Sequence, residues 1–262
     1  MELTLQAKRA YCYTGGKAFD VTLPTVVFIH GGELDHSVWT LPARYLAHHG
    51  FGVLAVDLPG HGRSEGPPLF SIEGMSDWII GLLDALHIEQ AALVGHSMGS
   101  LIALDVAGRR PGRVTKIGLL GATFPMRVAD ELMNATREDE PRAHQMINAW
   151  SHSAYAHYPN HPGPGSWIHG ANLRLMQRQK PGVLFADFNA CNAYNAGLER
   201  AKATTCPALF VLGKRDAMAP ARGGRELAKA FKNARVVELE GAGHSLMSER
   251  PDEVLDNLRA FL

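Results

Sequence analysis

The sequence of 262 residues has few cysteines and no excess charge of either sign. Its three cysteines, Cys12, Cys191 and Cys206, are scattered and form no C-x-x-C pair. This argues against a disulfide framework or a zinc finger and favours a reducing compartment. The 26 basic residues are balanced by 26 acidic ones, so the usual electrostatic reason to expect a nucleic-acid or anionic-membrane partner is missing.

Long apolar segments are also missing. No run approaches the roughly 18 residues that a membrane span needs, and the first residues lack the basic start and apolar stretch of a secretory signal. Hydrophobic residues make up 46% of the chain and charged residues 20%, which permits a buried core and excludes wholesale disorder. We expect a soluble, cytoplasmic monomer or homodimer with neither a membrane nor a nucleic acid as partner.

Short apolar runs alternate with segments of helical periodicity. The six runs cover residues 26–29, 52–56, 91–94, 117–120, 208–212 and 236–239. Continuous apolar runs are typical of parallel strands that are buried on both faces, and the intervening segments place apolar residues on one helical face. The pattern predicts an α/β protein whose parallel sheet is covered by helices. An antiparallel hairpin, turning at Gly15-Gly16, is expected within the first twenty residues.

The alternation stops between residues 126 and 202. This stretch shows no strand pattern, holds five of the 13 histidines, and contains an irregular segment rich in proline and glycine at 159–165. We predict an inserted helical cap at 126–202, while residues 1–125 and 203–262 form the core domain.

A nucleophile motif follows the run at 91–94. Gly95-His96-Ser97-Met98-Gly99 has the form G-x-S-x-G and precedes a helical pattern, which is the strand–turn–helix setting of a nucleophile elbow. The two glycines let strand and helix approach closely, and the strained turn exposes Ser97 Oγ beside a helix N-terminus that favours negative charge. We therefore predict that Ser97 is the nucleophile. His96 is expected to point away from the hydroxyl, as a packing or pocket residue.

A serine hydroxyl reacts only when a base accepts its proton. His244 follows the last predicted strand, and Asp216 follows the run at 208–212. An aspartate in that place fixes the tautomer of the histidine and stabilises its charged form. The chain order Ser97, Asp216, His244 is the order of an α/β-hydrolase triad. The alternative that Asp216 is only a turn residue stays open.

The developing oxyanion needs hydrogen-bond donors. The backbone N–H groups of Met98 and Gly32 are the candidates, since Met98 follows the nucleophile and Gly32 lies in the loop after the strand at 26–29. Glu33 comes next, and its carboxylate would oppose a nearby negative charge. We expect Glu33 to point to solvent or to pair with a cation.

Taken together, these motifs and the turn Asp57-Leu58-Pro59-Gly60-His61-Gly62-Arg63-Ser64 resemble the α/β-hydrolase superfamily. The resemblance is strongest to the small branch of carboxylesterases, enol-lactonases and meta-cleavage-product hydrolases, and it covers the chain outside the cap. It implies an α/β-hydrolase fold with a mostly parallel, eight-stranded sheet flanked by helices. It also implies a structural rather than catalytic role for the turn at 57–64.

The resemblance implies a serine hydrolase that cleaves a small carboxylic ester, lactone or thioester through an acyl-serine intermediate, with water as the second substrate and without cofactor or metal. One alternative is hydrolysis of a C–C bond in a ring-fission product, although Ser245 follows His244 where those enzymes often have tryptophan. A ligand-binding receptor or catalytically silent homologue is the alternative of another class.

The cap is expected to shape the substrate pocket. The candidate lining residues are Gly31, Glu33, His96, Trp150, Tyr155 and Trp167. Other apolar and aromatic residues of the cap, Phe188 among them, could also line an apolar pocket, although most of them are expected to form the core of the cap itself. A metal held by His157 and His161 is disfavoured, because Pro159 prevents the two histidines from sharing a helical face.

Overall fold

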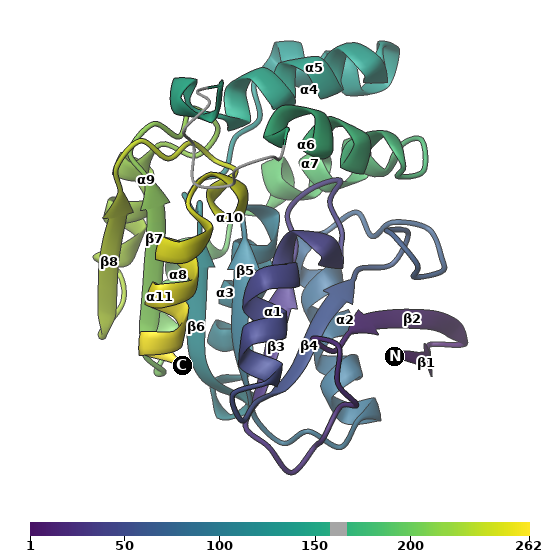
Figure 1. Ribbon diagram of the computed structural model, residues 1–262, viewed down its shortest axis with the longest axis vertical. Coiled ribbons are helices and arrows are strands. Elements are labelled where there is room, and N and C mark those ends of the chain that lie inside the picture. The colour runs from purple at the N-terminus through teal and green to yellow at the C-terminus, as the bar shows by residue number, and fades with distance from the viewer. Residues whose placement is uncertain (158–166) are drawn as a thin grey trace.

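Eight strands form one sheet in the order β1-β2-β4-β3-β5-β6-β7-β8 in the computed structural model, which describes residues 1–157 and 167–262 (Figure 1). The strands are β1 (Glu2–Leu5), β2 (Lys8–Tyr13), β3 (Thr25–Ile29), β4 (Gly52–Asp57), β5 (Ala91–His96), β6 (Val114–Leu120), β7 (Ala208–Gly213) and β8 (Ala234–Leu239). The six strands from β3 to β8 are parallel to one another, whereas β1 pairs antiparallel with β2 and β2 pairs antiparallel with β4. The predicted fold class is therefore confirmed.

Each of the six predicted apolar runs lies within one of the strands from β3 to β8. Every residue of β3, β4, β5 and β7 is buried, as expected where helices cover both faces of a parallel sheet. Strand β8 is partly exposed because it lies at the edge of the sheet.

The position of the N-terminal hairpin turn was predicted wrongly. Leu5 pairs with Lys8, so the chain turns at Gln6 and Ala7, which both have positive φ (51° and 58°). A two-residue turn of this kind matches the twist of the strands, but neither residue type signals it in the sequence. Gly15 instead allows a close approach, since a Cβ there would lie 2.4 Å from the Cβ of Ala47.

Helices pack on both faces of the sheet, because successive strand side chains point to opposite sides. Val26 and Phe28 share one apolar cluster with residues of α1 and α11, whereas Val27 and Ile29 share the other with residues of α2, α3, α8 and α9. The bounds of these helices are α1 (Thr40–Ala47), α2 (Ile72–Ala85), α3 (Met98–Arg109), α8 (Gly197–Ala203), α9 (Ala221–Ala228) and α11 (Pro251–Phe261).

A helical insert covers the carboxyl end of the sheet, at the top of Figure 1. It contains α4 (Asp130–Glu138), α5 (Glu140–Ser151), α6 (Ile168–Gln177) and α7 (Val183–Ala193). These helices share an apolar cluster that includes Leu132, Ile147 and Leu184. The predicted irregular segment at 159–165 lies outside the described residues, and the exact limits of the cap, 126 and 202, stay a prediction. The remaining short helices are η1 (His36–Trp39), η2 (Pro111–Arg113), η3 (Ala154–His157) and α10 (Leu246–Glu249).

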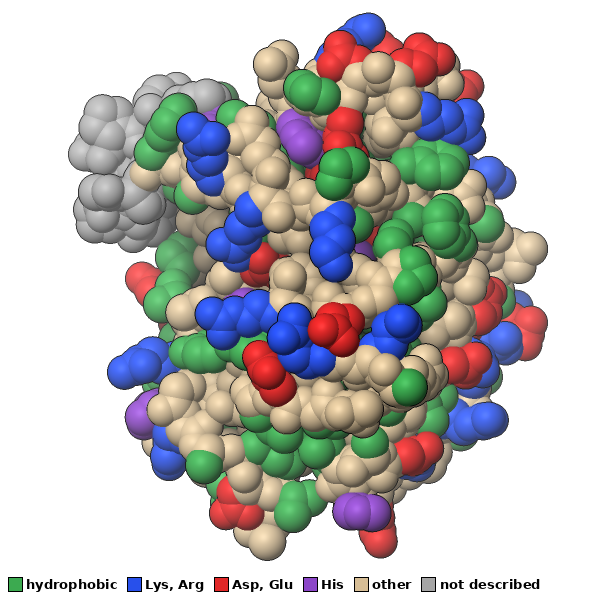
Figure 2. All heavy atoms as spheres, turned by 90° about the vertical axis from the view of Figure 1, so that its right-hand side faces the viewer, with side chains coloured by type: hydrophobic (Ala, Val, Ile, Leu, Met, Phe, Trp, Pro, Cys, Tyr) green, Lys and Arg blue, Asp and Glu red, His purple; other side chains and the backbone are tan. Residues whose placement is uncertain are grey.

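The surface carries both signs of charge. Figure 2 shows basic and acidic side chains intermixed on the side that faces right in Figure 1. None of the helices in the described part of the chain has the length and apolar character to cross a membrane. The cytoplasmic location, the absence of nucleic-acid and membrane partners and the oligomeric state stay predictions.

We expect Gly99→Ala to destabilise the protein although alanine is the better helix former. A Cβ at Gly99 would lie 2.3 Å from the carbonyl oxygen of Ile29, so α3 would have to move away from the sheet at a cost of about 2 kcal/mol or more. Urea unfolding measures the effect. Gly112→Ala is the matched control, because a Cβ there meets nothing within 4 Å and should change the free energy of unfolding by less than about 0.5 kcal/mol. Equal stability of the two variants would contradict the steric argument.

Candidate active site

Ser97 occupies a strained turn between β5 and α3. Its backbone has φ 52° and ψ −118°, a region that residues with a side chain rarely adopt. A Cβ at Gly95 would lie 2.0 Å from the carbonyl oxygen of Gly99, so only glycine lets the turn close this tightly. The N–H of Ser97 donates to the carbonyl of Leu120 on β6 at 2.9 Å. The turn therefore holds the serine at the carboxyl edge of the sheet.

His244 and Asp216 form a buried hydrogen-bonded pair, with 2.7 Å between His244 Nδ1 and Asp216 Oδ2. The other oxygen, Oδ1, accepts the backbone N–H groups of Met218 and Ala219 at 2.9 and 2.7 Å. Because this carboxylate only accepts, Nδ1 of His244 carries the proton and Nε2 is left as the acceptor. The sequence prediction placed these two residues together, and they lie together.

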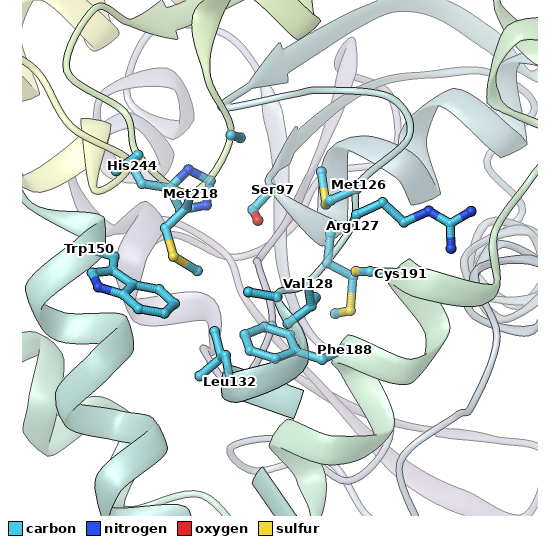
Figure 3. A pocket seen from close by; sticks show the side chains of 15 residues that line it. Ser97, Met126, Arg127, Val128, Leu132, Trp150, Phe188, Cys191, Met218 and His244 are labelled. Atoms are coloured by element: carbon cyan, nitrogen blue, oxygen red, sulfur yellow. The ribbon is translucent and has the colours of Figure 1, made fainter. Parts of the chain in front are cut away.

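Ser97 and His244 line the same cavity, and Figure 3 shows both side chains at its wall. Among the described residues, no direct hydrogen bond joins the Ser97 hydroxyl to the imidazole. This contact is often long in free enzymes and shortens when substrate binds.

The cavity has two adjoining lobes that share Gly32, Ser97, Phe188, Met218 and His244. The larger lobe has a volume of about 120 Å³ and the smaller lobe a volume of about 40 Å³, and both are mainly apolar. Additional apolar residues of the larger lobe are Met126, Val128, Leu132, Trp150 and Cys191 (Figure 3). Polar residues of the smaller lobe are Ser151, Asn172 and Ser245.

The structure places only some of the predicted pocket residues at the cavity. Trp150 lines the larger lobe, and Gly31 and His96 line the smaller one. Glu33, Tyr155 and Trp167 line neither lobe, contrary to the prediction. Tyr155 and Trp167 are 46% and 77% exposed on the cap, whereas Glu33 is buried beneath it. The metal prediction for His157 and His161 concerns side chains outside the described part of the structure.

Met218 lines both lobes and was not predicted. Phe188 also lines both lobes, and it was considered for an apolar pocket only as one of several aromatic residues of the cap. Phe188 lies on α7 and is 9% exposed. The residue type marked it as apolar, but the face of the cap helix that turns towards Ser97 is decided by packing. The position of Met218 at the cavity could have been predicted, because it lies two residues after Asp216 in the loop that follows β7.

The two predicted oxyanion donors both line the larger lobe. Met98 is the first residue of α3, so its N–H has no partner within the helix. Among the described residues, no acceptor takes the N–H of Met98 or of Gly32. A Cβ at Gly31 would lie 3.2 Å from the Cβ of Ser97, which shows how closely this loop approaches the serine.

Glu33 does not point to solvent, and that prediction was wrong. Its side chain is buried, and Oε1 lies 2.9 Å from Nε2 of His144 on α5, because the cap covers the loop. Burial raises the pKa of Glu33 to about 7. Burial by itself lowers the pKa of His144, but the hydrogen bond to Glu33 and the charge of Glu33 outweigh this effect and raise it. The other expectation was that Glu33 pairs with a cation. Its partner is His144, which is a cation when its imidazole is protonated.

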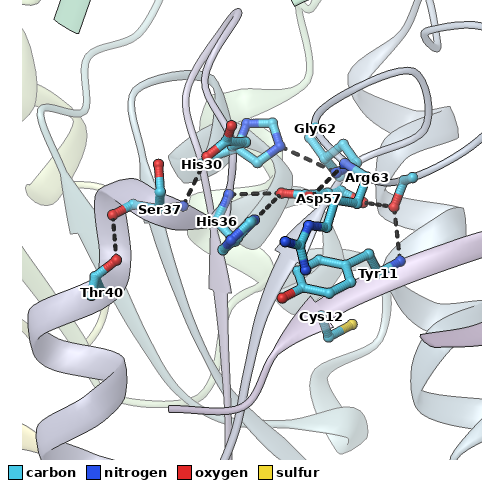
Figure 4. A network of polar contacts seen from close by, with 12 residues as sticks. Tyr11, Cys12, His30, His36, Ser37, Thr40, Asp57, Gly62 and Arg63 are labelled. Atoms are coloured by element: carbon cyan, nitrogen blue, oxygen red, sulfur yellow. Dashed lines mark hydrogen bonds and ion pairs between the residues drawn. The ribbon is translucent and has the colours of Figure 1, made fainter. Parts of the chain in front are cut away.

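Two groups of described side chains have metal-ligand atoms within 4.8 Å of one another. They are Glu33, Glu140 and His144, and Asp35, His36 and Asp57. Hydrogen bonds already connect members of both groups, including 2.8 Å between His36 Nδ1 and Asp57 Oδ1 (Figure 4). In both groups these hydrogen bonds hold neighbouring segments of the chain together, and we assign no metal to either group.

The α/β hydrolase fold family model matches residues 24–251. This chain belongs to the α/β-hydrolase family. The family assignment confirms the resemblance inferred from the sequence motifs, and the matched residues include the six strands from β3 to β8 and the helical insert.

Among its relatives is the pimeloyl-[acyl-carrier protein] methyl ester esterase of Chromobacterium violaceum, 32% identical over 229 residues that cover 85% of this chain and 87% of the relative. The esterase YbfF of Escherichia coli is 26% identical over 245 residues, covering 90% and 92%. The enol-lactonase of Burkholderia xenovorans has a similar structure, with a TM-score of 0.84, 24% identity, and coverage of 100% of this chain and 99% of the lactonase. This last likeness concerns the fold alone.

The Glu33–His144 pair predicts a specific pH dependence of stability. Glu33 has a pKa near 7 when folded and near 4.5 otherwise, so the folded state binds more protons between these values. The stabilisation is complete below pH 4.5 and is lost as the pH rises through 7, and the raised pKa of His144 acts with the same sign. We expect Glu33→Gln to reduce the loss of unfolding free energy between pH 5 and pH 8 by about 2 kcal/mol.

Urea unfolding at pH 5, 6.5 and 8 measures this loss, with Glu2→Gln, at an exposed position, as the matched control. An unchanged pH slope in Glu33→Gln would show that the pair does not titrate in this range.

Proposed function

We propose that this α/β hydrolase is a serine esterase that hydrolyses a small carboxylic ester through an acyl-serine intermediate. The observation that supports it best is the position of Ser97, on a strained turn, at the same cavity as the hydrogen-bonded His244–Asp216 pair. The esterases among its relatives agree with this reaction. Lactones and thioesters present the same carbonyl chemistry and belong to the proposed substrate class.

The reaction has two halves. Ser97 Oγ attacks the ester carbonyl carbon while Nε2 of His244 accepts the hydroxyl proton. The tetrahedral intermediate collapses, the bond to the alcohol oxygen breaks, and His244 returns the proton to the departing alcohol. A water molecule then gives a proton to His244 and attacks the acyl carbon. Collapse releases the carboxylic acid and returns the proton to Ser97 Oγ.

Two groups lower the barrier in this scheme. Asp216 holds the imidazole in the tautomer with a free Nε2 and stabilises the imidazolium that forms. The N–H groups of Gly32 and Met98 donate to the oxyanion, where negative charge develops. Both donors lack a protein acceptor among the described residues, so neither needs to break a bond first.

The cavity supports a small substrate with unequal ends. The larger, apolar lobe suits a short hydrocarbon chain, and the smaller lobe suits a compact group on the other side of the carbonyl. The 26 basic and 26 acidic residues balance each other, which agrees with a substrate of little or no charge.

The triad predicts the effect of two substitutions on hydrolysis of nitrophenyl esters from acetate to decanoate. Ser97→Ala removes the nucleophile and should abolish turnover. Asp216→Asn should lower kcat by about 10⁴-fold while the protein stays folded, because the imidazole then adopts the wrong tautomer. Equally slow hydrolysis by wild type and Ser97→Ala would refute esterase action, and full activity of Asp216→Asn would move the acid role to another residue.

Two further measurements separate the alternative functions. The dienoic ring-fission product is yellow and loses its colour when it is cleaved. Cleavage of this compound at a higher rate than hydrolysis of any ester would favour the C–C hydrolase. Tight retention of a ligand, together with ester hydrolysis no faster than that of Ser97→Ala, would favour a receptor.

The larger lobe predicts which residue limits chain length. Trp150→Ala enlarges this lobe, so the ratio of kcat/KM for decanoate to that for butyrate should rise about 10-fold or more, since a methylene in an apolar pocket contributes roughly 1–3 kcal/mol. Trp167→Ala is the matched control, because Trp167 is 77% exposed and lines neither lobe. The same chain-length profile in both variants would contradict the assignment of Trp150.

A further inference from the structure

The cap contacts the loop that carries a proposed oxyanion donor. Asp187 on α7 is fully buried, and its Oδ2 accepts the backbone N–H of Glu33 at 2.8 Å. Glu33 directly follows Gly32, so this hydrogen bond fixes the peptide plane on one side of Gly32. A Cβ at Gly32 would lie 3.5 Å from Cβ of Asp187 and 3.2 Å from the ring of Phe188. Helix α7 therefore packs directly on the loop.

The loop needs such an external contact. Glu33 has a φ of 53°, a left-handed conformation that costs a residue with a side chain roughly 1–2 kcal/mol. Strained backbone of this kind persists only where the surroundings hold it. Among the described residues, the carboxylate of Asp187 is the acceptor that holds the Glu33 N–H.

The negative charge of Asp187 lies close to the proposed oxyanion hole, and His61 is the residue that balances it. Nε2 of His61 lies 2.8 Å from Asp187 Oδ2, and Nδ1 lies 3.1 Å from the carbonyl oxygen of Pro59. A neutral imidazole has one N–H, so donation to both acceptors requires the imidazolium. Burial by itself lowers the pKa of His61, but the charge of Asp187 and the hydrogen bond to it outweigh burial and raise it. The pair is buried with no net charge.

The turn at 57–64 fixes the position of His61. Asp57 accepts the N–H of His36 and the N–H of Arg63, both at 2.8 Å (Figure 4). Gly62 has a φ of 46°, and a Cβ there would lie 2.3 Å from Asp57 Oδ2. The resemblance implied a structural role for this turn. Its contacts hold the imidazole of His61 next to Asp187 of the cap.

We propose that Asp187, with its charge balanced by His61, is a positioning residue that holds Gly32 in the geometry needed to donate to the oxyanion. The inference rests on the proposed esterase function. It makes the cap part of the oxyanion hole in addition to its role as a wall of the cavity, and it explains why a buried carboxylate is tolerated so close to a developing negative charge.

The test compares Asp187→Ala and Asp187→Asn, with kcat expressed per active site after titration with a fluorophosphonate. Asp187→Ala removes the acceptor, and kcat should fall about 10²-fold with KM nearly unchanged, as for loss of an oxyanion donor. Asp187→Asn keeps an acceptor oxygen and should restore most of the activity. Asp187→Leu, which keeps the volume, replaces the alanine variant if that variant does not fold.

Asp105→Asn and Asp105→Ala are the matched controls. Asp105 is also fully buried and is hydrogen-bonded to Arg109, Arg200 and Tyr194, but it lines neither lobe of the cavity. These variants should lose stability in urea and keep the wild-type kcat. An equal loss of kcat in the Asp105 and Asp187 variants would assign the effect to general destabilisation and overturn the proposal.

A second readout reports on the oxyanion itself. An alkyl trifluoromethyl ketone of the best chain length adds Ser97 Oγ to its carbonyl carbon, and the resulting oxyanion lies in the hole while His244 keeps the proton. Its inhibition constant should rise in Asp187→Ala by the factor by which kcat/KM falls. The unfluorinated ketone, which binds without this addition, should retain its affinity.

Two failures remain distinguishable. If the wild type hydrolyses esters and reacts with the fluorophosphonate, but Asp187→Ala keeps the wild-type kcat and ketone affinity, the positioning role is overturned and the esterase function stands. If the wild type cleaves no ester, the esterase function fails and the positioning role fails with it.

Discussion

The geometry of the site depends on how closely the first turn of α3 approaches the ends of β3 and β5. Gly95 and Gly99 make this approach possible, because a Cβ at either position would overlap backbone atoms. The close approach forces Ser97 into its strained conformation at the carboxyl edge of the sheet. The same approach brings the loop after β3 against Ser97, so one packing contact positions both the hydroxyl and the proposed oxyanion donors.

The cap completes this arrangement through buried polar contacts. Asp187 contacts the loop after β3. Glu249 accepts the N–H of Gly243 at 2.9 Å and the hydroxyl of Ser153 at 2.6 Å, which ties the loop of His244 to the segment after α5. The carbonyl of Ser151 accepts the N–H of His244 at 2.8 Å. The elements that carry the proposed oxyanion donor and the base are thus both held from above by the insert, and buried polar groups with partners on both sides resist separation.

Sequence reasoning performed well where a local pattern carries the information. The apolar runs located six strands because parallel strands that are buried on both faces leave few polar positions. Ser97, Asp216 and His244 were found because each follows a strand, and the carboxyl ends of parallel strands meet at one edge. It failed at the hairpin turn, where Gln6 and Ala7 adopt positive φ without glycine, and at Glu33, whose burial depends on a helix that is more than a hundred residues away in the chain.

The sequence by itself therefore determined the fold, the family and the three residues proposed for catalysis, since periodicity and short motifs are local properties. Only the tertiary structure decided which cap residues face the serine. Trp150 lines the cavity while Tyr155 and Trp167 lie on the surface, although all three are aromatic residues of the same insert. It also decided the partners of Glu33, His61 and Asp187. The physical reason is that the rotation of each cap helix and the pairing of buried charges are set by packing between segments far apart in the chain, and no short stretch of sequence encodes that packing.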